Sequence, residues 1–175
     1  VPAILILTLA WTLKSMTDSL GAAEYVSGVV ANSAAGLQQL LPAIIFIVAA
    51  FLAFATGTSW GTFGILIPIC IAVFPAAEPL RIISISACMA GAVCGDHISP
   101  ISDTTIMASA GAECKHVHHV SSQLPYALTV ATVSFITFLV AGFTQQLGIF
   151  GSAVVSWICG ISLLAGALYV LKKKF

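Results

Sequence analysis

The stretch that decides the fold is GDHISPISD, residues 95–103, which interrupts a long apolar segment with two carboxylates, two serines and a proline. A carboxylate at the centre of a bilayer costs at least about 2.5 kcal/mol on insertion scales, so acidic residues inside apolar segments are rare and functional. Pro100 has no N–H and would leave the Asp96 carbonyl without its helical donor. We therefore expect a helix that is broken here, with polar groups gathered at the break.

The composition around this stretch is that of an integral membrane protein. Of the 175 residues, 59% are hydrophobic and 7% are charged, with six basic and six acidic side chains. No Asp, Glu, Lys or Arg occurs between Glu24 and Glu78, or between Lys115 and Lys172. A soluble domain could not build a polar surface from such stretches. The charge balance also excludes a nucleic-acid partner held by a basic patch.

The remaining apolar blocks define the expected helices. Residues 124–143 and 153–171 each approach the roughly 20 residues of a spanning helix. The two apolar arms that flank the break together match one span, so residues 82–111 predict one discontinuous helix. Residues 1–37 predict a helix followed by an interfacial or broken segment. Because the chain opens on Val1, we expect it to be part of a longer protein.

Residues 41–75 predict a re-entrant hairpin. Its arms, 41–55 and 63–74, reach only about 18–23 Å as helices, against a hydrocarbon core of about 30 Å. The linker TGTSWGT, residues 56–62, is rich in glycine and hydroxyls. We expect the arms to enter and leave on one side, with the linker near the midplane in a protein or wet surrounding. An ordinary polar surface loop is the alternative.

Basic residues predict the orientation of the chain. The lysines at residues 172–174 place the C-terminus in the cytoplasm, and counting two spans back puts Lys115 on the same side. The discontinuous helix then begins outside. Arg81, the only arginine, is the one basic residue that this orientation leaves on the outer side.

The break and the hairpin linker together offer hard oxygen ligands, which suit Na⁺ better than a soft metal. A carboxylate holds either a cation or a proton, so one site can exchange the two by competition. The alternative is that Asp96 and Asp103 cap helix ends at an interface, where Asp103 would be a good N-cap. The groups at the break are Asp96, Asp103, Ser99, Ser102, Thr104 and Thr105, and those of the linker are Thr56, Thr58, Ser59 and Thr62.

The histidines and cysteines suggest fewer roles. His97 lies beside Asp96 and has the pKa range of a proton relay, although a structural histidine is the alternative. No helical pair of ligands with a nearby carboxylate points to zinc, so we expect the other histidines in a solvated cytoplasmic loop: His116, His118 and His119. Five cysteines without CxxC spacing do not indicate a disulfide framework.

Four strings of this sequence resemble the NhaC-type sodium/proton antiporter family. They are GDHISPISDTTIMAS (95–109), ATGTSWGTFGILIP (55–68), HHVSSQLPYA (118–127) and LAWTLKSMTDSLG (9–21). The resemblance implies an all-α membrane protein built from inverted repeats, with re-entrant hairpins beside discontinuous helices. This chain would be its C-terminal half. Lys14, which follows the LAW motif, departs from the family pattern and puts an ionic role of that helix in doubt.

The resemblance also implies a function. External H⁺ would be exchanged for internal Na⁺ across the inner (cytoplasmic) membrane by a multi-pass carrier that is not an enzyme and needs no cofactor besides its transported ions. The implied ion-binding residues are Asp96, Asp103, Ser99, Ser102, Thr104, Thr58 and Ser59, with the two aspartates holding Na⁺. The expected partners are the lipid bilayer and the remaining N-terminal half of the carrier, and a homodimer stays open.

Three alternative functions remain at this stage. Similar carriers exchange malate or lactate together with Na⁺ and H⁺, so an organic-acid antiporter is the first alternative. Such a carrier needs anion donors, and the placement of Arg81 on the outer side counts against it. A channel is the second, although paired acids favour a carrier. A membrane anchor without transport is the third, and it would need neither the acids nor the broken helices.

Overall fold

The computed structural model describes residues 35–174 and, before them, Thr8, Thr12, Ser15, Met16, Ser19, Leu20 and Gly21. The predicted segment 1–37, with Lys14 and the acidic residues that follow it, therefore lies almost wholly outside the described residues. Residues 35–174 form helices and no strands. The helices are α3 (Ala35–Thr56), α4 (Ser59–Val73), α5 (Pro79–Ile98), α6 (Asp103–Gly111), α7 (His116–Phe143) and α8 (Gly148–Lys174), with a 3₁₀ turn, η1 (Gln145–Leu147), before α8.

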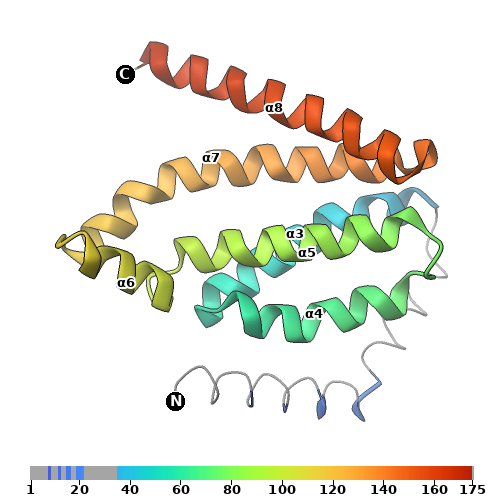
Figure 1. Ribbon diagram of the computed structural model, residues 1–175, viewed down its shortest axis with the longest axis horizontal. Coiled ribbons are helices and arrows are strands. Elements are labelled where there is room, and N and C mark those ends of the chain that lie inside the picture. Colours follow the sequence, from blue (N-terminus) through green and yellow to red (C-terminus); the bar gives the residue numbers. More distant parts are fainter. Residues whose placement is uncertain (1–7, 9–11, 13–14, 17–18, 22–34, 175) are drawn as a thin grey trace.

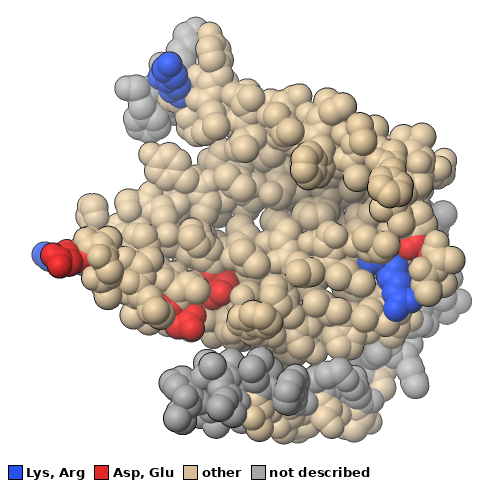
Figure 2. Space-filling model, in the orientation of Figure 1, with Lys and Arg blue, Asp and Glu red and all other residues tan. Residues whose placement is uncertain are grey.

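Four segments within the described residues are long and apolar enough to cross a membrane. They are Leu37–Thr56, Pro79–Ile98, His116–Phe143 and Gln145–Lys172. On the face shown in Figure 2, Lys and Arg lie towards the two ends of the molecule, and acidic groups also lie between the left end and the middle. These features describe an all-helical, multi-pass membrane protein, as the sequence predicts.

The first arm of the predicted hairpin is longer than expected. Helix α3 begins at Ala35 and has 22 residues, which gives about 33 Å and is enough for a span. The polar residues Gln38 and Gln39 concealed this start, but glutamine is a good helix former. The predicted arm length is therefore wrong for α3, and its length does not exclude a span. Helix α4 has only 15 residues, and the re-entrant course of the hairpin stays a prediction.

The helix break is shorter than the sequence predicts. Helix α5 continues through Gly95, Asp96 and His97 to Ile98, and α6 begins at Asp103. Only residues 99–102 are non-helical, because a proline restricts the residue directly before it and not those further upstream. Since α5 alone has 20 residues, the break lies at the end of a span-length helix and not halfway along one. Its depth in the bilayer stays a prediction.

Helices α7 and α8 also begin earlier than predicted, at His116 and Gly148 instead of residues 124 and 153. His116, His118 and His119 therefore lie in the first turn of α7, which corrects their predicted placement in a loop. Thr144 and Ser152 join the two helices by a hydroxyl pair at 3.1 Å. In Figure 1, α8 lies along the outer side of α7, at the edge of the structure.

Helices α3 and α5 run parallel in close contact. A Cβ on Gly91 would overlap the Phe46 carbonyl oxygen, and one on Gly95 would overlap that of Ala50. The Ser99 hydroxyl continues this series by donating to the Phe54 carbonyl. Each step advances both helices by about one turn, so the contacts keep a fixed register. Small residues allow this approach, and the ends of α3 and α5 consequently lie side by side.

Candidate functional site at the helix break

The turn between α3 and α4 lies against the break between α5 and α6. Gly57 has φ +67°, and a Cβ there would lie 2.8 Å from Ile101 Cγ1 and 3.0 Å from its carbonyl carbon and oxygen. Ser99 Oγ donates to Phe54 O over 2.7 Å. The structure therefore brings together the two polar segments that the sequence analysis paired.

Asp96 is the buried carboxylate of this region, with 8% of its surface exposed. Ser102 Oγ donates to Asp96 Oδ1 over 2.7 Å and lies 2.7 Å from Thr104 Oγ1. A serine hydroxyl has one proton, so Thr104 must donate to Ser102 when Ser102 donates to Asp96. A hydroxyl chain therefore leads from exposed Thr104 to buried Asp96. Oδ2 of Asp96 accepts no hydrogen bond from the described residues.

Ser102 also explains the start of α6. Its side chain accepts the backbone N–H of Thr104 at 3.2 Å, and it is the N-cap of the helix. This corrects the alternative in which Asp103 is the N-cap, because Asp103 is the first residue of the helix. Asp103 is exposed, near the positive end of the α6 dipole. The two aspartates are thus unequal, one buried and one exposed.

The other predicted site residues lie close by but bond elsewhere. Ser99 is fully buried, and its hydroxyl is engaged with α3. Thr58 is the N-cap of α4, where its Oγ1 accepts the N–H of Gly61 at 3.5 Å. Ser59 is buried in the first turn of α4. Within the described residues, no hydrogen bond joins Thr58 or Ser59 to Asp96.

Two backbone carbonyls at the end of α5, those of Asp96 and His97, accept hydrogen bonds. Pro100 offers no N–H to the Asp96 carbonyl, as predicted, but this carbonyl accepts the N–H of Ser99 at 3.1 Å instead and is therefore not free. His97 O accepts two bonds, from Thr105 Oγ1 at 3.0 Å and from Gln123 Nε2 at 2.8 Å.

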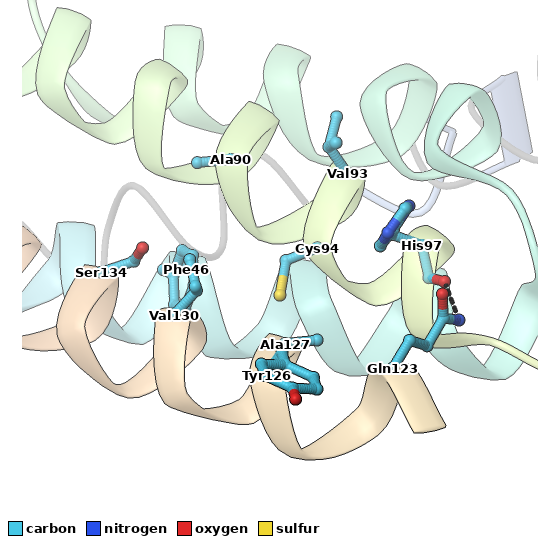
Figure 3. A pocket seen from close by; sticks show the side chains of 10 residues that line it. All are labelled: Phe46, Ala90, Val93, Cys94, His97, Gln123, Tyr126, Ala127, Val130 and Ser134. Atoms are coloured by element: carbon cyan, nitrogen blue, oxygen red, sulfur yellow. Dashed lines mark hydrogen bonds between the residues drawn. The ribbon is translucent and has the colours of Figure 1, made fainter. Parts of the chain in front are cut away.

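His97 is exposed and lines a cavity. The cavity, of about 460 Å³, lies between α5 and α7, with Phe46 of α3 at its edge. In Figure 3, Cys94 points towards α7, and the Gln123 amide meets the His97 carbonyl. No hydrogen bond between the His97 ring and Asp96 occurs in the described region, so the proton relay stays a prediction.

Three residues hold the break: Thr105, which the sequence already places there, and Gln123 and His116, which it does not. The first two share the His97 carbonyl, and His116 Nε2 lies 2.6 Å from Pro100 O. The only sequence signal was the density of polar residues in an apolar chain. Contacts across helices, such as that from residue 116 to residue 100, have no signature in a single sequence.

A broken helix, four span-length segments and a buried carboxylate held by hydroxyls are typical of secondary membrane transporters. The comparisons with known proteins identify the family. Residues 1–143 match the model of the Na⁺/H⁺ antiporter family, and the chain belongs to that family.

Relatives of this chain include several carriers. It is 46% identical over 173 residues to an uncharacterized protein of Haemophilus influenzae, covering 98% of this chain and 32% of that protein. It is 34% identical to a malate-2H⁺/Na⁺-lactate antiporter of Bacillus subtilis (62% of this chain, 24% of that protein). An arginine/ornithine antiporter of Halobacterium salinarum is 33% identical (65% and 24%). The chain thus spans about a third or less of these relatives. No solved structure matches it.

Proposed function

We propose that this chain is the ion-binding part of an antiporter that exchanges Na⁺ for H⁺, with Asp96 as the group that carries either ion. The observation that supports this most is the buried Asp96 carboxylate, whose Oδ1 accepts the Ser102 hydroxyl at 2.7 Å. Burying a carboxylate is costly unless it is paired or protonated. A group in that position favours occupation by a cation or by a proton, and exchange follows when each displaces the other.

The hydroxyl chain gives this competition a structural form. Ser102 can donate a hydrogen bond to the ionised Asp96. When Asp96 is protonated, the same hydroxyl can accept a hydrogen bond from it instead. A Na⁺ ion at Asp96 would use the carboxylate together with hydroxyl oxygens of Ser102 and Thr104. These are the hard ligands that alkali cations prefer. Asp103, exposed at the start of α6, would attract the cation to the break.

The remaining predicted ligands would act during conformational change. Ser99 is bonded to α3, and Thr58 and Ser59 belong to the adjoining turn. A displacement of the α3–α4 turn against the break would bring these hydroxyls towards the ion or withdraw them. We propose that the rest of the carrier supplies the matching half of the transport unit. The whole protein would lie in the inner (cytoplasmic) membrane, with dimerisation open.

An organic-acid antiporter is the second candidate. The relatives named for exchange of malate with lactate, and of arginine with ornithine, favour it. The cavity beside the break adds a specific observation, because His97, Gln123 and Tyr126 line one part of it. A small organic acid would need such polar groups in an otherwise apolar cavity.

Transport by the full-length carrier in everted vesicles tests the proposal. With an internal pH dye, added Na⁺ should collapse an acid-inside gradient. Asp96→Asn should abolish this response at normal protein level, and Asp103→Asn should weaken it by raising the Na⁺ concentration needed. Ser121→Ala is the matched control, because this exposed serine bonds only within its own helix among the described residues. Exchange by Asp96→Asn at the parent rate would refute the site.

Adding organic acids separates the two candidates. If malate, lactate or a basic amino acid is required for the Na⁺ response, the second function replaces the first. If Na⁺ alone suffices and these compounds leave the rate unchanged, simple cation exchange stands.

A further inference from the structure

His116 connects the first turn of α7 to the break. Its Nε2 lies 2.6 Å from the Pro100 carbonyl oxygen, and its Nδ1 lies 3.0 Å from Ser109 Oγ in α6. The ring is half-buried, and Ser109 is 3% exposed. Both ring nitrogens thus have partners, one in the break and one in the helix that follows it.

The chemistry of the partners determines the roles of the nitrogens. A carbonyl oxygen only accepts, so Nε2 must carry a proton to bond Pro100. Ser109 Oγ can donate to Nδ1 when the ring is neutral. When the ring is protonated, Ser109 can accept from Nδ1 and give its own proton to the Ile106 carbonyl, 2.8 Å away. Ser109 therefore fits both protonation states, and in each of them Nε2 remains a donor to Pro100.

Pro100 lies between the two serines of the break, and each serine bonds a different part of the structure. Ser99 bonds α3, and Ser102 bonds Asp96. The contact from His116 adds an anchor from α7 between them. Fixing the Pro100 carbonyl restricts the backbone on both sides of it, and Ser102 lies only two residues further along.

We propose that His116 is a positioning residue for the ion site: it holds the break through Pro100, and Ser109 holds the other nitrogen of the ring. This inference rests on the proposed function, because it assumes that the break binds the transported cation. It resembles metal sites in which a group outside the ligands orients them. The exposed His118 in the same turn has no comparable contact with the break among the described residues.

Two substitutions of His116 separate its contact with Pro100 from its contact with Ser109. The amide nitrogen of Gln reaches about as far as Nε2, so His116→Gln keeps a donor for Pro100. The shorter Asn reaches only the position of Nδ1, so His116→Asn keeps a partner for Ser109 and loses Pro100. In the full-length carrier, His116→Asn should raise the apparent KM for Na⁺ about 10-fold, as for lost orienting partners at metal sites. His116→Gln should stay close to the parent, as should His118→Asn.

A double substitution tests the contact with Ser109. Ser109→Ala should raise the apparent KM for Na⁺ when residue 116 is His, because the ring then loses one of its two bonds and can turn away from Pro100. It should have no such effect in the His116→Gln protein, whose amide has no nitrogen at the Nδ1 position. An equal rise in both proteins would overturn the assignment to Ser109. A parent KM in both His116→Asn and Ser109→Ala would overturn the positioning role.

A measurement without transport distinguishes failure of this inference from failure of the proposed function. A spin label attached at Ile101→Cys, in a full-length carrier whose native cysteines are replaced by alanine, reports the mobility of the break. The label should be more mobile with His116→Asn than with histidine or glutamine at that position. Equal mobility in all three would contradict the anchor, whatever ion the carrier transports. If the label responds but Na⁺ is not exchanged, only the proposed function fails.

Discussion

Gly57 and Ile101 are in contact, although they lie in two inter-helix connections that are far apart in the sequence. Gly57 turns the chain between α3 and α4 with φ +67°, and Ile101 lies in the break between α5 and α6. An added Cβ at residue 57 would lie 2.8 Å from Ile101 Cγ1. The turn therefore cannot shift towards the break without displacing it. This contact couples the hairpin to the segment that carries the Asp96–Ser102 pair.

The first prediction concerns this contact. Gly57→Ala introduces a side chain at positive φ, which costs roughly 1–2 kcal/mol, and also presses on the backbone of Ile101. We expect a lower apparent melting temperature in detergent and slower Na⁺-dependent proton movement. Gly166→Ala is the matched control, since nothing lies within 4 Å of its Cβ position and its φ is not positive. A Gly57→Ala carrier as stable and active as the control would contradict the close contact.

The second prediction concerns the register of α3 and α5. Gly95→Ala would place a methyl group against the backbone carbonyl of Ala50, which cannot yield as a flexible side chain would. The helices must separate, and the bond from Ser99 to Phe54 further along the same register should break. We expect poor accumulation of the protein in the membrane and a lower melting temperature. Gly111→Ala, with nothing near its Cβ position, should behave like the parent.

The sequence predicted the elements better than their ends. Runs of apolar residues revealed the helices, because burial in lipid demands them. The starts of α3 and α7 were hidden by Gln38, Gln39 and the histidines, whose polarity does not prevent a helix. Polarity marks where a helix leaves the lipid and not where its hydrogen bonds end. For this reason α3 is longer than the arm predicted for residues 41–55.

The site was predictable in part. Asp96 and Ser102 were selected because polar groups are costly among apolar residues, and the structure joins them by a hydrogen bond. The difference in burial between Asp96 and Asp103 was not predictable, because it depends on the side of the four-residue break on which each aspartate lies. The contacts of Thr105, Gln123 and His116 depend on how α6 and α7 fold back onto α5. A single sequence does not encode such packing in a readable pattern.

The third prediction concerns the shared acceptor at the end of α5. Thr105 Oγ1 and Gln123 Nε2 both donate to the His97 carbonyl. Thr105→Val or Gln123→Leu alone leaves one donor, so each should cost little. Together they leave this carbonyl without either side-chain donor, at a cost of about 1–3 kcal/mol. The loss in melting temperature of the double variant should therefore exceed the sum of the single losses. Strict additivity would show that the two donors do not share this acceptor.

The last prediction separates the two tasks of Ser102, which caps α6 and donates to Asp96. Replacing an N-cap serine by alanine costs about 0.5–2 kcal/mol, whereas glycine costs only a few tenths. Ser102→Gly and Ser102→Ala should therefore differ in melting temperature, with alanine the less stable. Both remove the hydroxyl, so both should raise the apparent KM for Na⁺ to the same extent. If only the alanine variant loses Na⁺ affinity, the serine acts through the helix cap, and its hydroxyl is not part of the ion site.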